Sequence, residues 1–129
     1  MPQGLPNREQ IDRFLVDEID TVPQLEALLL IWNRRPKTWY CSEISKSLYI
    51  SQDLARDVIR HLEQHHLLVK LESQVDSYAL RTDSQELEWM LAGVDDLYRR
   101  ELVRISNLIH EKASRAVRDF ASAFRFKKE

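Results

Sequence analysis

The fold is decided by the stretch Ser42-Glu-Ile-Ser-Lys-Ser-Leu-Tyr-Ile-Ser-Gln-Asp-Leu54. Its first half predicts a short helix with Ser42 as the N-cap, because a serine hydroxyl accepts a hydrogen bond from the first turn. Tyr49-Ile50 is a tight connection, and Ser51 is placed to cap a second helix. Two helices joined by so short a turn are typical of a helix-turn-helix.

A longer helix is predicted before this stretch. Thr21 and Gln24 have the spacing of a capping box, in which each side chain accepts a hydrogen bond from the other residue's backbone. The helix that follows has one apolar stripe of residues at helical spacing, made by Leu25, Leu28, Leu29 and Trp32. Pro36 ends it. Residues 39–41 then form a short extended segment.

After the helix-turn-helix the hydrophobic period changes from helix to strand. Leu54, Val58 and Leu62 recur every four residues and predict the buried edge of the second helix. Leu67, Val69 and Leu71 alternate with Leu68, Lys70 and Glu72, as in a half-buried strand. Tyr78 and Leu80 alternate again through Arg81, and the polar stretch 73–76 separates the two runs. Two alternating runs around a short polar loop predict a β-hairpin.

This order of elements is that of a winged helix-turn-helix, and the sequence resembles the winged-helix repressors of the MarR and PadR kinds over residues 21–81. The matching residues are Ser42, Glu43, Ile44, Leu48, Ile50, Ser51, Val58, Leu62, Leu67, Leu68, Tyr78 and Leu80, with one residue fewer between Ser42 and Glu43. His66 replaces the glycine usual before the wing. We therefore expect a join of different shape, because a positive φ is costly for residues other than glycine.

Residues 1–20 are predicted to be an N-terminal extension, frayed over 1–10 and followed by a short helix that contains Ile11 and Leu15. Residues 82–129 predict one long C-terminal helix, for which Thr82, Asp83 and Ser84 are candidate N-caps. From residue 84 to 126 it would be about 60 Å long. No proline interrupts it, and Gly93 is the one position where it could kink or split.

So long a helix outgrows the domain, and we expect part of its apolar stripe to pair with a second copy in a homodimer. The residues assigned to this coiled-coil-like contact are Leu87, Leu91, Val94, Tyr98, Leu102, Ile105, Ile109 and Phe120. The alternative is a kinked helix that folds back on its own domain.

Positive charge is concentrated at the end of the chain. From Lys112 to Lys128 there are six basic residues against one acidic residue, Asp119. The basic and aromatic tail residues are Arg115, Arg118, Phe120, Phe124, Arg125, Phe126, Lys127 and Lys128. We interpret them as cations that suit a helix C-terminus and aromatics that pack on the dimer partner. Contact with phosphates, acidic lipid headgroups or an acidic protein groove is the alternative.

The fold and the resemblance predict a DNA-binding transcriptional regulator that acts as a winged-helix homodimer. Gln52, Arg56 and Arg60 are candidate readers of base edges, and Lys46, Ser51 and Lys70 are candidate phosphate contacts. Charge favours an alternative, because carboxylates at Asp53, Asp57, Glu63, Glu72 and Asp76 share these segments. That alternative is a winged-helix protein-protein interaction module, an adaptor or regulatory subunit, which does not bind DNA.

Composition restricts the remaining functions. The single cysteine, an N-terminal stretch unlike a secretory signal and the lack of a long apolar run predict a cytoplasmic protein without a membrane span. His61 and His65 have the i, i+4 spacing of metal ligands, but we interpret them as exposed histidines, and the lone Cys41 as structural, although a redox role is possible. No catalytic motif is present. We therefore expect no enzymatic activity, no metal and no cofactor.

Overall fold

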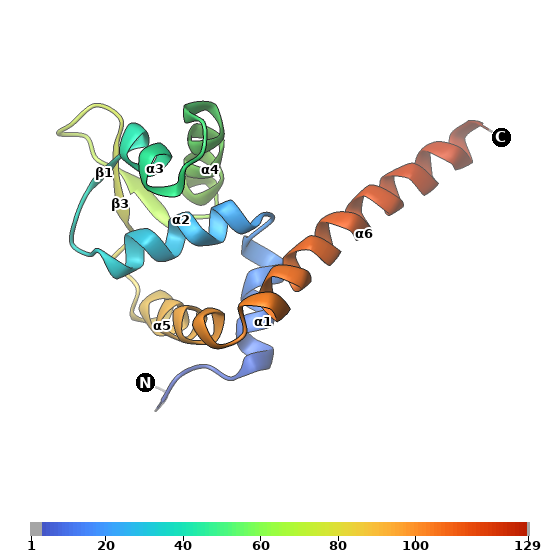
Figure 1. The fold of residues 1–129 in the computed structure, drawn as a ribbon, viewed down its shortest axis with the longest axis horizontal. Helices are drawn as coiled ribbons and strands as arrows, with labels where there is room; N and C mark the ends of the chain where they lie inside the picture. Colours follow the sequence, from blue (N-terminus) through green and yellow to red (C-terminus); the bar gives the residue numbers. More distant parts are fainter. Residues whose placement is uncertain (1–3, 129) are drawn as a thin grey trace.

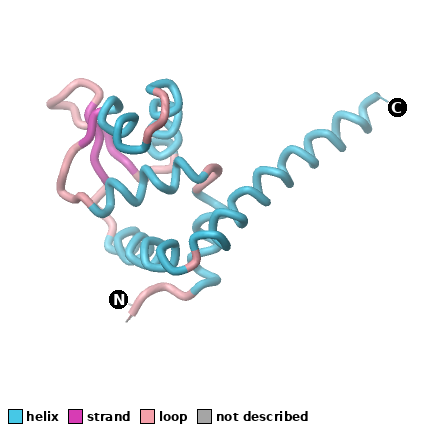
Figure 2. Tube along the Cα trace, viewed as in Figure 1, coloured by secondary structure: helices cyan, strands magenta, loops and turns pink. Residues whose placement is uncertain are grey.

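The computed structural model describes residues 4–128, with side chains up to residue 123. This part of the chain is mostly helical with a small β-hairpin and a C-terminal helix, as predicted, and β1 adds a third antiparallel strand to the hairpin (Figures 1 and 2). Its elements are α1 (Arg8–Glu18), α2 (Val22–Asn33), β1 (Trp39–Tyr40), α3 (Cys41–Leu48), α4 (Gln52–Gln64), β2 (Leu68–Lys70), β3 (Ser77–Leu80), α5 (Gln85–Arg100) and α6 (Leu102–Lys128).

Helix α2 is the centre of the core. The predicted capping box is present: the Gln24 N–H donates to Thr21 Oγ1 at 3.3 Å, and the Thr21 N–H donates to Gln24 Oε1 at 3.2 Å. The buried residues extend beyond the predicted stripe to Ala27 and Ile31. Helix α2 is therefore buried over more than one face, and it lies between α3 and α4 on one side and α5 on the other (Figure 1).

The hairpin and the short strand before α3 form one sheet in the order β1-β3-β2. Leu68 pairs with Leu80 in the predicted hairpin, and Trp39 pairs with Tyr78 on the other side of β3. Together with α2, α3 and α4, this sheet is the arrangement of a winged helix-turn-helix.

The start of α3 differs from the prediction. The helix begins at Cys41, so Ser42 lies in its first turn and is not the N-cap. The N-cap is Tyr40, whose backbone N–H donates to Glu43 Oε1 at 2.9 Å. Because this hydrogen bond and the ammonium of Lys37 favour the charged carboxylate, they hold the pKa of Glu43 below its ordinary value.

The join between α4 and the wing keeps the left-handed geometry that glycine favours. His66 has φ 60°, and its N–H donates to the Glu63 carbonyl at 3.0 Å, while the Leu67 N–H donates to the Leu62 carbonyl at 2.9 Å. These are the hydrogen bonds of a glycine-type helix end. The prediction of a different shape is therefore wrong, and His66 adopts the strained conformation instead.

Residues 4–10 of the N-terminal extension are ordered, and residues 1–3 lie outside the described part of the chain. Asn7 and Gln10 form a capping box, with the Gln10 N–H donating to Asn7 Oδ1 at 2.8 Å, so α1 begins at Arg8 and the predicted fraying to residue 10 is wrong for residues 4–10. Pro6 is buried against Gly93 of α5.

The C-terminal segment is two helices. Of the three predicted N-cap candidates, Ser84 is the N-cap of α5. Helix α5 continues through Gly93 without interruption. The break falls at Glu101, with φ −132° and ψ 48°. Helix α5 folds back under α2, and α6 leaves the body and projects outward (Figure 1).

This break changes the assignment of the dimer residues. Five of them are buried in the chain's own core: Leu87, Leu91, Val94, Ile105 and Ile109. Tyr98 is partly buried against that core, whereas Leu102 and Phe120 are exposed. Most of the residues predicted to form the dimer contact therefore pack inside one chain, because α5 covers the second face of α2. This agrees with the alternative of a helix that folds back on its own domain.

The α5–α6 junction is held by an ion-pair network. The Glu101 carboxylate accepts hydrogen bonds from Arg8 and from Arg104 Nε, the latter at 2.5 Å. Arg104 also donates to both carboxylate oxygens of Asp12 in α1, at 2.9 and 3.1 Å. A bidentate pair of this kind fixes orientation as well as distance, so it sets the direction in which α6 leaves the body.

We expect Gly93→Ala to destabilise the protein. A Cβ at this position would lie 2.3 Å from Pro6 Cγ and 2.6 Å from Pro6 Cδ. Overpacking costs about 1–3 kcal/mol, more than the roughly 1 kcal/mol gained in helix propensity. Urea unfolding measures the difference. Pro6→Ala removes both clashing atoms, so the double variant should be more stable than Gly93→Ala alone; a more stable Gly93→Ala single variant would contradict the close packing.

The Glu101 junction should make stability depend on pH. The hydrogen bond from Arg104, and then that from Arg8, lower the pKa of Glu101. A carboxyl whose pKa falls on folding stabilises the fold above its unfolded pKa, and this is lost as pH drops through the folded pKa. We expect Glu101→Gln to lower the Tm at neutral pH. The difference in Tm between the native chain and this variant should vanish in acid, well below a pH of about 4.3. Glu9→Gln is the exposed control; a Tm difference that does not change with pH would refute the stabilising role of the Glu101 carboxylate.

Candidate nucleic-acid interface

Helix α4 presents the predicted polar face to solvent. The Ser51 Oγ accepts the Leu54 N–H at 3.1 Å, which confirms the N-cap. The buried edge consists of Ala55, Val58, Ile59 and Leu62, whereas Leu54, predicted on that edge, is 40% exposed. With this edge against the core, the three predicted base readers on α4 are exposed: Gln52, Arg56 and Arg60.

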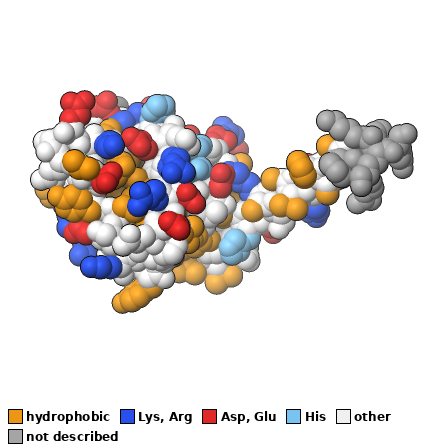
Figure 3. Space-filling view, turned by 90° about the horizontal axis from the view of Figure 1, so that it is seen from above, with side chains coloured by type: hydrophobic (Ala, Val, Ile, Leu, Met, Phe, Trp, Pro, Cys, Tyr) orange, Lys and Arg blue, Asp and Glu red, His pale blue; other side chains and the backbone are white. Residues whose placement is uncertain are grey.

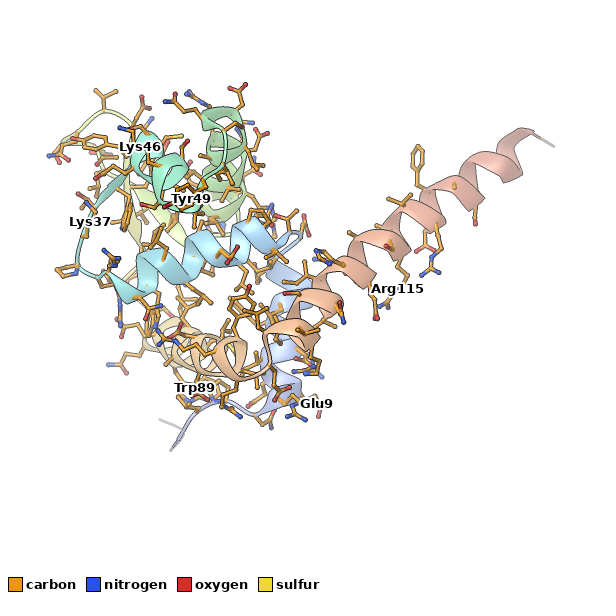
Figure 4. All side chains as sticks on the ribbon, viewed as in Figure 1. Glu9, Lys37, Lys46, Tyr49, Trp89 and Arg115 are labelled. Atoms are coloured by element: carbon orange, nitrogen blue, oxygen red, sulfur yellow. The ribbon has the colours of Figure 1, made fainter. Side chains whose placement is uncertain are left out.

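The turn between α3 and α4 is fixed by Ser45. Its buried hydroxyl donates to the Ile50 carbonyl at 2.6 Å, and its own carbonyl accepts the Ile50 N–H at 3.1 Å. This turn leaves Tyr49 in the left-handed region with φ 57° and its side chain 95% exposed (Figure 4). Sequence reasoning treated Tyr49 only as a connector and missed its exposure. Tyr49 thus has a strained backbone and a ring exposed to water, and no packing compensates for either. A bulky residue of this kind is a candidate binding residue.

The predicted phosphate contacts surround α4. Lys46 of α3, Ser51 at the N-cap and Lys70 of β2 are all exposed. The wing tip carries no cation, and its Val75 is 83% exposed. The structure thus brings the six DNA-binding candidates to three elements of the winged helix-turn-helix unit.

Charges of both signs share this face. In the view from above, Lys and Arg side chains lie among Asp and Glu side chains over the body (Figure 3). Arg60 pairs with Asp57 at 3.2 Å, an exposed ion pair that contributes at most about 1 kcal/mol. Arg56 has no ion-pair partner within residues 4–123 and is the more available of the two arginines.

A hollow of about 200 Å³ lies between α4 and the hairpin, with Arg56, Glu63 and Cys41 in its lining. Burial raises the pKa of the Cys41 thiol, which donates to the Gln52 carbonyl at 3.8 Å. Because the thiolate is the reactive form, a thiol held protonated agrees with the structural interpretation of Cys41.

The histidines of α4 connect it to α1. The rings of His61 and His65 are stacked with centroids 4.2 Å apart. His61 Nε2 lies 2.7 Å from the Glu18 carbonyl, and His65 Nδ1 lies 2.7 Å from the Glu18 carboxylate. They are therefore packed between helices and not exposed as predicted. Across residues 4–123 no three His, Cys, Asp or Glu side chains converge as a metal site.

Comparison with protein-family models, curated proteins and solved structures returns no match to this chain. Over the helices that residues 4–128 form, none has the length and apolar character needed to span a bilayer. The tail side chains from Phe124 to Lys128 lie outside the described side chains, whereas Arg115, Arg118 and Phe120 are exposed.

We expect Tyr49→Gly to raise the free energy of unfolding by about 0.5–1 kcal/mol, because glycine adopts positive φ without strain and the exposed ring contributes no packing. Chemical denaturation measures this change. Tyr49→Phe keeps the backbone strain and should have native stability. A Tyr49→Gly chain less stable than the native chain would show that the ring contributes to the fold.

Proposed function

We propose that this chain is a transcriptional regulator that binds duplex DNA as a winged-helix homodimer, as its resemblance to the MarR and PadR repressors implies. One observation carries the proposal: Gln52, Arg56 and Arg60 lie along one exposed face of α4. From the first to the last the helix rises about 12 Å, which matches three to four base pairs. The major groove is wide enough to admit such a helix.

The surrounding side chains support this docking. Lys46 and Lys70 are exposed on α3 and β2, the two elements that pack against α4, so with α4 in the groove they are the candidate phosphate contacts. Arg56 is free to bind a guanine edge or a phosphate, because no carboxylate within residues 4–123 pairs with it. Arginine and glutamine are suited to reading base edges by paired hydrogen bonds.

A second candidate function is supported by the charge of the same face. Four cations there, Lys46, Arg56, Arg60 and Lys70, share it with five carboxylates, Asp53, Asp57, Glu63, Glu72 and Asp76. Carboxylates oppose phosphate, and the exposed apolar side chains of Tyr49 and Val75 suit a protein surface. The second candidate is therefore a protein-protein interaction module that uses α4 and the wing and does not bind DNA.

Binding to random duplex DNA, measured by fluorescence anisotropy at low and rising salt, separates the two functions. We expect the native chain to bind at low salt with a steep salt dependence. The double variant Lys46→Ala/Arg56→Ala should bind about tenfold more weakly, with a salt slope smaller by about 1 per lost phosphate contact. Arg13→Ala, an exposed cation on α1, is the control for loss of charge.

Two results would overturn DNA binding. The native chain could fail to bind at low salt, or the double variant could bind as tightly as Arg13→Ala. Either result would favour the protein-interaction module.

A further inference from the structure

The hollow between α4 and the hairpin has the size of a small metabolite. Its less polar lining consists of Ile59, which is buried, and of Cys41 and Tyr78, which are partly buried. The volume is about 200 Å³, below the roughly 300–1,000 Å³ of pockets that hold drug-sized molecules. Since a water molecule takes about 30 Å³ of the liquid, this space corresponds to about seven waters. A small organic molecule therefore fits the hollow, whereas a large one does not.

The rim of this hollow carries charges of both signs. Arg56, Arg60 and Glu63 follow one side of α4 in steps of four and three residues, and Asp76 lines the hollow from the hairpin. Among the side chains that the structure describes, Arg56, Glu63 and Asp76 form no salt bridge, and Arg60 pairs with Asp57, which is not part of the lining. Two cations and two carboxylates thus surround one hollow without pairing across it.

This rim favours a ligand that carries both charges. A metal ion would be repelled by the two guanidinium groups, and a free phosphate would be repelled by the two carboxylates. A molecule with one carboxylate and one ammonium group can pair with both kinds of side chain and adds no net charge. A hollow with walls of low dielectric concentrates the field of the charges that line it, so such pairs are stronger here than on an open surface.

We propose that the hollow binds a small aliphatic α-amino acid. Its carboxylate accepts hydrogen bonds from Arg56 and Arg60, because the guanidinium group matches a carboxylate in charge and geometry. Its ammonium group donates to the carboxylates of Glu63 and Asp76. Its alkyl group packs on Ile59, which supplies the apolar surface.

A bound amino acid would compete with DNA. Arg56 and Arg60 are also the candidate readers of base edges, and a guanidinium group that binds a carboxylate is not available to a guanine. This consequence rests on the proposed DNA-binding function, whereas the amino-acid site does not. The hollow thus couples occupancy by a small molecule to release of the duplex.

An NMR titration of the isotope-labelled full chain with L-valine, without DNA, tests the site. Isobutylamine and isovalerate are matched probes, because each keeps the branched alkyl group of valine and lacks one of its two charges. We expect L-valine to shift the amide signals of Cys41, Ile59 and Tyr78 in a saturable manner, and each single-charge probe to bind about tenfold more weakly or less. No saturable shift with L-valine, or equal binding of either probe, would overturn the proposal.

The double variant Glu63→Gln/Asp76→Asn removes both partners of the ammonium group with little change in size. Asparagine tolerates the positive φ of residue 76, which is 57°. We expect about tenfold weaker binding of L-valine and no loss of isovalerate binding, whereas a damaged fold would lose both. Glu9→Gln, which removes an exposed carboxylate of α1, is the control and should bind as the native chain does. Native affinity of the double variant for L-valine would refute the assigned ammonium partners.

Fluorescence anisotropy measures the competition separately. L-valine should displace the native chain from random duplex DNA, and it does so without raising the ionic strength because its net charge is zero. A chain that binds L-valine but no DNA would contradict the proposed function and support the amino-acid site. A chain that binds DNA but not L-valine would have the opposite meaning.

Discussion

The structure depends on the burial of α2 on two sides. A helix with Leu25, Ala27, Leu28 and Ile31 over more than one face cannot leave either of these sides in water at small cost. The helix-turn-helix and the sheet cover one side, and this unit alone leaves the other side exposed. Helix α5 covers that side with Leu87, Leu91 and Val94. Helix α5 in turn holds the N-terminal extension in place, because Pro6 packs against α5 at Gly93, which has no side chain.

The break at Glu101 follows from this requirement. A straight helix from residue 84 onward could not both cover α2 and follow α1, so the chain turns at Glu101. There Arg8 and Arg104 donate to the Glu101 carboxylate, and Arg104 also donates to Asp12. The turn determines which apolar residues are core and which are surface. Ile105 and Ile109 enter the core with α5, while Val103 and Val117 face solvent.

The exposed face of α4 contributes little to the stability of the fold. Its geometry comes from local interactions, the Ser51 cap and the Ser45 hydrogen bonds to the turn, and from the buried edge that includes Val58 and Leu62. Gln52, Arg56 and Tyr49 contribute nothing to the core, and Tyr49 is held at positive φ. Residues that the fold does not require, on an element that the fold holds firmly, can be selected for binding. That separation is the physical basis of the proposed interface.

The elements that could be predicted from the residues alone are those whose signals are local: the capping box at Thr21, the Ser51 cap, the hairpin and the outward face of α4. Each follows from hydrogen bonds or periodicity within a few residues. Features that depend on residues distant in the sequence became visible in the folded chain. The N-cap at Tyr40 depends on Glu43 and on strand pairing, the break at Glu101 depends on α1, and the burial of Leu87 and Leu91 depends on α2 having two faces to cover. An apolar stripe shows that a helix needs a partner, but the pattern is the same whether that partner is its own chain or another, because burial free energy depends on the area removed from water and not on its source.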